Sequence, residues 1–150
     1  MLHAKHILSK DDLHAVTEAI RAAERKSSGE IRVEIRQRRH RKERALSIEQ
    51  IARREFVSLG MTKTKGRTGI LIFLLLEDRK FQILADQGIH EKVDDSVWAE
   101  LANHMSKHFA HGEFRRGLVR TVEAVGDLLA QHFPRSSADR NELPDDVKIS

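Results

Sequence analysis

The chain has 150 residues, of which 39% are hydrophobic and 33% are charged, and its formal net charge is +4. This length and apolar content predict one compact domain with a surface rich in ions. The chain has no cysteine, which excludes disulfides, thiolate metal ligands and cysteine nucleophiles. Because we find neither an apolar leader segment nor a run long enough to cross a bilayer, we expect a cytoplasmic protein without a membrane span.

The first predicted helix follows Ser9, whose hydroxyl can cap it together with Asp12 three residues further on. Apolar residues then recur at helical spacing until the small residues at 27–29 end the helix. Residues 30–36 alternate strictly between charged and apolar side chains. This period of two predicts a half-buried strand near one side of the sheet.

A strongly basic segment follows, with seven Lys and Arg side chains between residues 32 and 44. The segment Ser47–Gln50 repeats the capping pattern and opens a second helix. The apolar stripe of that helix continues until Gly60, where we expect it to end.

The centre of the chain holds the longest apolar run, Ile70–Leu76. Its length and β-branched content predict a central strand that is buried on both faces. The polar tetrad Glu77–Lys80 turns the chain, and Phe81–Ala85 returns as a second strand. A hairpin forces an antiparallel pairing, so the sheet must be mixed.

Two further helices are predicted after the hairpin. The third helix begins at Val93–Ser96, where several side chains can cap it, and Gly112 breaks it. The last helix begins at Phe114 and ends at Phe133-Pro134. Beyond that point the residues are polar and lack periodicity, so we expect residues 135–150 to be a disordered polar tail.

The predicted order of elements is α-β-α-β-β-α-α. Helices must cover both faces of the doubly buried strand, so the expected fold is a three-layer α/β/α sandwich around a small mixed sheet. Residues 1–134 would form this single domain.

Several short segments occur in an order and spacing that resemble the TPM domain family, over roughly residues 9–134. They are Ser27-Ser28-Gly29-Glu30-Ile31-Arg32-Val33, Thr68-Gly69-Ile70-Leu71-Ile72, Asp78-Arg79-Lys80, Asp86-Gln87-Gly88-Ile89 and His132-Phe133-Pro134. The last segment is similar to the ending of a short bacterial subgroup. The resemblance implies an α/β/α sandwich, which agrees with the predicted order of elements.

The resemblance also implies three kinds of function. Some members of the family bind divalent cations such as calcium, a plant member is described as an acid phosphatase, and others assist the assembly or repair of membrane complexes. Metal-binding members carry Asp-Asn-Gly before the central strand. This sequence has Arg67-Thr68-Gly69 at that place.

A cluster of oxygen-bearing side chains is predicted at one end of the sheet, because the hairpin returns the chain to that end. Its members are Glu30, Thr68, Asp86, Asp94 and Asp95. Hard cations take several oxygen ligands, so this set is a candidate site for calcium or magnesium. The alternative is structural: Asp94 or Asp95 caps a helix, and Asp86 forms a turn beside Gly88.

A second candidate metal site is the histidine series His104, His108 and His111, whose spacing places the three imidazoles on one face of the third helix. The alternative is a solvent-facing flank, with imidazoles favoured near the carboxyl end of a helix.

The basic segment gives a candidate anion site at Arg38, Arg39 and Arg41, and Arg67 could hold a phosphate bidentately. No aromatic side chain alternates with these cations to stack on bases, so nucleic acid is not an expected partner. In a phosphatase, Asp86 or Asp95 would act as general acid beside Arg67.

The resulting expectation is a non-enzymatic TPM-type binding or accessory domain, with a protein partner in a membrane-associated complex. The first alternative is an acid phosphatase that depends on a divalent metal. The second is a basic adaptor for anionic surfaces or nucleic acid.

Overall fold

The structure, a computed structural model, describes residues 7–135, 144–145 and 147–150. The helices of this part are α2 (Lys10–Glu24), α3 (Ile48–Ser58), α4 (Gln87–His90), α5 (Asp95–Ala110) and α6 (Phe114–His132). The strands are β1 (Glu30–Arg36), β2 (Gly69–Leu75), β3 (Lys80–Ala85) and β4 (Lys148–Ile149). Up to α6 these elements follow the predicted order, with the one-turn helix α4 added.

The strands form one mixed sheet in the order β3-β2-β1-β4. Strand β1 runs parallel to β2 and to β4, while β2 and β3 form the predicted antiparallel hairpin. Across β1 and β2, Glu30 lies opposite Gly69, and across the hairpin Ile70 lies opposite Ala85. The hairpin turn contains Arg79 in the left-handed backbone region, with φ +52°.

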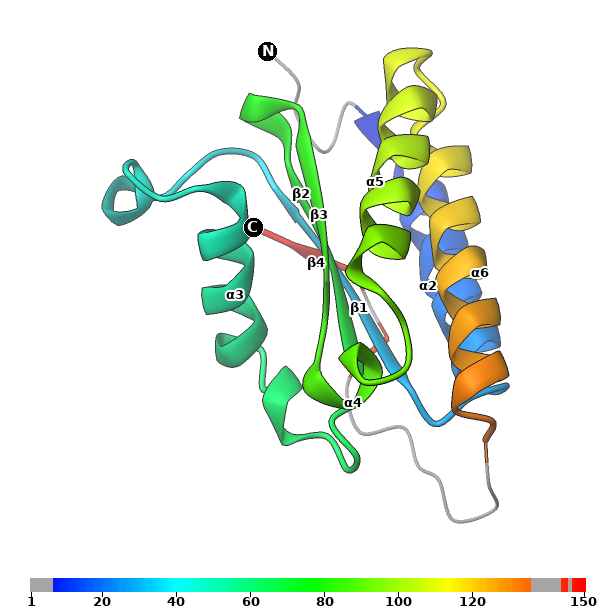
Figure 1. Cartoon of the computed structure of the whole chain (residues 1–150). Helices are drawn as coiled ribbons and strands as arrows, with labels where there is room; N and C mark the ends of the chain where they lie inside the picture. The colour runs from blue at the N-terminus through cyan, green and yellow to red at the C-terminus, as the bar shows by residue number, and fades with distance from the viewer. Residues whose placement is uncertain (1–6, 136–143, 146) are drawn as a thin grey trace.

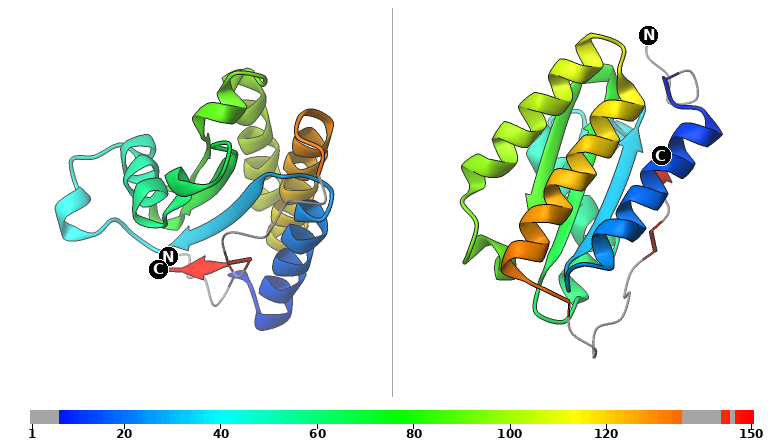
Figure 2. Two further views of the ribbon diagram at one scale, coloured as in Figure 1. Left: turned by 90° about the horizontal axis from the view of Figure 1, so that it is seen from below. Right: turned by 90° about the vertical axis from the view of Figure 1, so that its right-hand side faces the viewer.

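Helices cover both faces of the sheet, as predicted for a three-layer sandwich. Helix α3 lies on one face, and helices α2, α5 and α6 lie side by side on the other (Figures 1 and 2). Capping boxes of the predicted kind begin α2 at Ser9 and α3 at Ser47. In the part of the chain that the structure describes, no helix is long and apolar enough to cross a bilayer.

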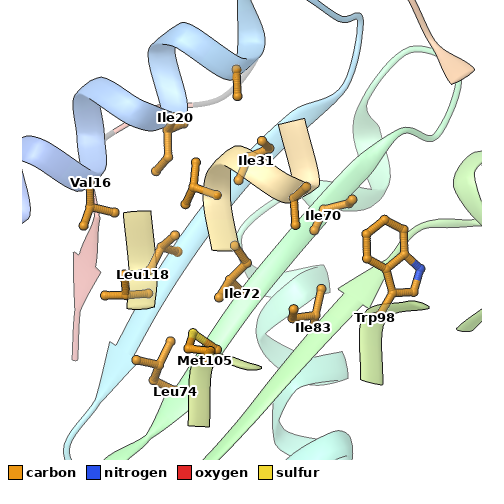
Figure 3. Packing of buried hydrophobic residues seen from close by; sticks show 14 of the residues in the cluster. Val16, Ile20, Ile31, Ile70, Ile72, Leu74, Ile83, Trp98, Met105 and Leu118 are labelled. Carbon is orange, nitrogen blue, oxygen red and sulfur yellow. The ribbon is translucent and has the colours of Figure 1, made fainter. Parts of the chain in front are cut away.

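Each face of the sheet carries its own hydrophobic core. The larger core joins β1, β2 and β3 to the three-helix layer, with Ile31, Ile72 and Leu118 fully buried between them (Figure 3). The smaller core packs Leu71, Phe73 and other side chains of β2 against α3. Strand β2 is therefore buried on both faces, as its continuous apolar run predicts.

The end of the chain differs from the predicted disordered tail. Lys148–Ile149 forms strand β4 beside β1, and the Ser150 N–H donates to the Ile35 carbonyl at 2.9 Å. The physical reason is that β1 would otherwise leave one row of backbone donors and acceptors without partners. Residues 136–143 and 146 of the predicted tail lie outside the described residues.

Candidate functional site

Three of the predicted metal-site residues meet at the end of the sheet where β1 and β2 begin. Glu30 lies opposite Gly69, and its N–H donates to the Thr68 carbonyl at 3.1 Å. The Asp86 N–H donates to the Gly69 carbonyl at 2.9 Å, which brings the end of β3 to the same place. The hairpin therefore gathers the backbone of Glu30, Thr68 and Asp86 as the sequence predicts.

The side chain of Asp86 forms an ion pair with Arg67. The Arg67 Nε donates to one carboxylate oxygen at 2.7 Å, and Nη2 donates to the other at 2.8 Å. The Gln87 N–H adds a third hydrogen bond at 2.8 Å. This bidentate geometry is the strong form of an arginine–carboxylate pair, and it raises the pKa of Arg67 above its usual range.

The backbone at Arg67 is fixed in an unusual conformation. Its φ is +56°, which non-glycine residues rarely adopt. Its N–H donates to Thr64 and its carbonyl accepts from the Gly88 N–H at 2.9 Å. Gly88 permits this approach, because a Cβ there would lie 2.2 Å from the Gly66 carbonyl oxygen. The Arg67–Asp86 pair therefore sits on a rigid junction between two loops.

The side chains of Thr68, Asp94 and Asp95 serve other elements, and the Glu30 side chain is buried. The Thr68 hydroxyl donates to the Ser28 carbonyl at 3.3 Å. Asp94 caps α5 by accepting from the Ser96 N–H, and Asp95 lies 2.8 Å from His90 Nδ1. Among the described residues, no three His, Asp or Glu side chains form a group that could hold a metal ion. The geometry thus gives the predicted cation site no support.

The histidine series lies at the end of α5, as predicted, but its imidazoles are engaged separately. His108 Nδ1 lies 3.1 Å from a Glu113 carboxylate oxygen, and His111 Nδ1 lies 2.8 Å from the Lys107 carbonyl. His111 stands at the cap position, just beyond the last residue of the helix, and His104 is exposed.

The predicted anion-binding arginines divide into two kinds. Arg39 forms an ion pair with Asp78 of the hairpin turn and donates to the Leu46 carbonyl. Arg38 and Arg41 are exposed, and no described residue forms an ion pair with either. The loop that carries them projects from the sheet beside α3 (Figure 1).

A buried charged network that the sequence does not reveal lies on the α3 side of β1. The Arg36 guanidinium, 1% exposed, contacts Glu43 and Glu55 at 2.5 Å and Glu34 at 3.3 Å. Lys148 of β4 approaches Glu55 at 3.2 Å. The alternating charges of β1 predict a solvated face, but α3, the basic loop and β4 enclose that face.

The pKa values within this network move in different directions. Burial raises the pKa of Glu34. Burial also acts on Glu43, but hydrogen bonds from Arg36 and from the His40 backbone outweigh it and lower that pKa. Burial on Glu55 is likewise outweighed by hydrogen bonds from Glu34 and Lys148, so its pKa is lowered. Glu34 is therefore the member of the network whose pKa is raised, while those of Glu43 and Glu55 are lowered around Arg36.

Comparison with known proteins agrees with this architecture. A family model described as the TPM domain matches residues 2–128. The structure is similar to the NMR structure of the BA42 protein from the psychrophilic bacterium Bizionia argentinensis, at 33% identity and a TM-score of 0.87, over 100% of each chain.

It is also similar to the N-terminal domain of a protein from P. gingivalis, with a TM-score of 0.71 over 87% of this chain and 81% of the other. At 20% identity that likeness concerns the fold alone. None of the curated proteins matches the chain. Because the family model spans most of the sequence, the chain belongs to the TPM domain family.

Proposed function

We propose that this chain is a non-catalytic binding domain that acts as an accessory module in a larger protein assembly. The observation that carries the proposal is the Arg67–Asp86 pair. A guanidinium contacts both oxygens of the carboxylate that ends β3, at 2.7 and 2.8 Å. That carboxylate is thereby neutralised by a side chain of the protein itself.

The position of Arg67 argues against the metal-dependent phosphatase. Divalent cations of the calcium and magnesium type need several oxygen ligands, of which carboxylates supply the negative charge. A fixed positive charge beside Asp86 repels a second cation, and it replaces the acidic side chain of the family's Asp-Asn-Gly pattern. Both carboxylate oxygens of Asp86 already accept hydrogen bonds from Arg67, so neither oxygen is free to meet a substrate.

The resemblance to family members that assist membrane complexes gives this module a partner class. We propose that the partner is a protein of a membrane-associated complex, bound through the surface of the sandwich. The buried network around Arg36 supports a rigid scaffold role, since it ties β1, α3 and β4 together through charges that are enclosed by the fold.

Calorimetric titration with calcium and with magnesium tests the proposal. The wild-type chain should give no heat and no thermal shift at millimolar metal. The variant Arg67→Asn should gain weak calcium binding, because Asn tolerates a positive φ, adds an oxygen and frees Asp86. Arg53→Asn, an exposed arginine of α3, is the matched control and should behave as the wild type.

Calcium binding by the wild type that Asp86→Ala abolishes would contradict the proposal. So would turnover of p-nitrophenyl phosphate that is lost in the same variant.

A further inference from the structure

Strand β3 presents an open edge of the sheet. Among the described strands it is the outermost on its side, and β2 is its one partner there. The hydrogen bond from the Asp86 N–H to the Gly69 carbonyl fixes the alternation of the antiparallel ladder. The backbone N–H and C=O groups of Phe81, Ile83 and Ala85 therefore point outward. In the part of the chain that the structure describes, no hydrogen bond takes up these groups.

This edge forms the floor of a cleft of about 440 Å³. Glu49 and Arg53 of α3 line one wall, and Trp98, Ala99 and Ala102 of α5 line the other. Figure 1 shows the two helices on opposite faces of the sheet beside β3. An extended segment laid along the strand is what unpaired edge groups bind.

The cleft meets a smaller apolar pocket at the beginning of β3. That pocket has a volume of about 250 Å³ and is lined by Leu76, Phe81, Phe109 and Phe114. Phe81 lines both cavities, so they adjoin at this residue. Its edge-on contact with Phe109, with ring centroids 4.8 Å apart, holds the ring in place. The pocket is suited to one large apolar side chain.

Charge at this end of the cleft is positive. Arg79 and Lys80 are exposed, and no described residue forms an ion pair with either. The other ionic side chains of the cleft compensate one another, because Arg53 pairs with Glu49 and His90 pairs with Asp95. The cations at the hairpin turn thus remain available to an acidic group of a ligand.

We propose that this cleft binds an extended peptide segment of a partner protein as an added strand beside β3. A large apolar side chain of the segment enters the phenylalanine-lined pocket, and an acidic residue next to it contacts Arg79 and Lys80. The inference rests on the proposed binding function, to which it adds the mode of recognition. The charge of the cleft and the shape of its floor both select this occupant.

Trp98 provides a further contact and a reporter. It is the one tryptophan of the sequence, and its ring lies beside Ile83 with the nitrogen directed away from the core (Figure 3). Its buried Nε1–H has no hydrogen-bond partner among the described residues. An unsatisfied buried donor is costly, and a peptide carbonyl would supply the acceptor after a small movement of the ring.

The test begins with a random heptapeptide phage library, selected on the full-length wild type and in parallel on Ala99→Trp. The new indole fills the cleft from an exposed helical position, so the fold should persist. Ala22→Trp, at an exposed position of α2, is the matched control. Peptides with an acidic residue beside a large apolar one should be enriched on the wild type and on Ala22→Trp, and lost on Ala99→Trp.

The enriched peptide is then synthesised, and its binding is followed by fluorescence anisotropy and by nitrogen-15 NMR. The backbone amides of Phe81, Ile83 and Ala85 and the Trp98 indole signal should shift and gain protection from hydrogen exchange. Charge reversal of Arg79 and Lys80 to Glu should weaken binding about tenfold, as for other complementary charges at an interface. The same reversal of Arg25 and Lys26, two exposed residues that follow α2 at the other end of the sheet, should not.

Three results would overturn the inference. The first is a lack of peptide enrichment on the wild type over Ala99→Trp. The second is a set of amide shifts that map to another surface. The third is a wild-type dimer that Ala99→Trp dissociates, because a second copy of the chain would then be the occupant. The calcium and phosphatase measurements are independent of these results, so a failed peptide test is distinguishable from a failed proposal of a non-catalytic domain.

Discussion

Replacing Arg36 by Met should destabilise the domain strongly. Met keeps an unbranched stem of similar length, so the change removes the guanidinium with little loss of packing. It leaves Glu34, Glu43 and Glu55 without the cation that they share at 3.3, 2.5 and 2.5 Å. The side chains of Glu43 and Glu55, whose pKa values are lowered, are only 8% and 13% exposed, so little water can take the place of the lost partner.

The expected loss follows from that burial. Removing one member of a buried ion pair costs about 3–5 kcal/mol, because the other charge stays in the interior without compensation. The free energy of unfolding of a domain of this size is about 5–15 kcal/mol, so the expected loss is a large share of it. At about 2–4 °C per kcal/mol, the melting temperature should fall by about 6–20 °C.

The loss of stability in Arg36→Met relative to the wild type should depend on pH. The pKa values of Glu43 and Glu55 are lowered in the folded state, so their stabilisation is present above the unfolded pKa of about 4.3. That stabilisation is lost as the pH falls through the folded pKa values. The difference between wild type and variant should therefore be largest near neutral pH and shrink below about pH 4.

Urea denaturation followed by circular dichroism at pH 7 and at about pH 3 measures both effects, because the lower pH is below the window in which the stabilisation begins to be lost. Arg53→Met is the matched control. Its ion pair with Glu49 is exposed on the same side of the sheet, so the change should cost less than about 1 kcal/mol. A loss in Arg36→Met no larger than in this control, or one that does not change with pH, would refute the reasoning.

Two further substitutions test the interior and the loop junction. Burial, and then a hydrogen bond with Asp145, raise the pKa of Glu24 far above its usual range. Glu24→Gln should therefore not lower the free energy of unfolding. A raised folded pKa means that wild-type stability falls as the pH rises above the unfolded pKa of about 4.3. The urea midpoint of the variant should therefore rise relative to that of the wild type between about pH 5 and pH 9. A difference between the two midpoints that does not change with pH would show that Glu24 is ionised. Gly88→Ala places a Cβ 2.2 Å from the Gly66 carbonyl oxygen and should cost about 1–3 kcal/mol in thermal unfolding, against less than about 0.5 kcal/mol for the exposed neighbour Gln87→Ala. Equal melting temperatures for these two variants would show that the loops move apart freely.

Local signals account for the parts of the fold that the sequence predicts. The capping side chains of Ser9 and Ser47 satisfy backbone donors within three residues, so these helix starts need no tertiary information. The apolar run of β2 predicts burial on both faces, because only a central strand between two layers accommodates it. Each of these signals is confirmed within a residue or two of its expected position.

Strand β4 lacks such a signal. Lys148–Ile149 contributes two residues to the ladder, after a stretch with no alternation, and its pairing depends on the open edge of a strand more than a hundred residues earlier. The charged face of β1 is a related case. Its alternation predicts that the charged face is exposed to solvent. Whether that face is buried depends instead on whether α3, the basic loop and β4 supply an ion-pair partner for each charge.

The Arg67–Asp86 pair shows the same difficulty at the candidate site. The sequence places Asp86 among cation ligands and Arg67 among anion-binding cations, because each side chain has that chemistry when considered alone. The residues lie 19 positions apart, and the hairpin between them makes them neighbours. Two opposite charges that meet at 2.7 Å compensate each other, so neither side chain acts as the separate site that its own chemistry predicts. The outward-facing backbone groups of the hairpin lie along the outer edge of β3, which is where we propose that a peptide segment binds.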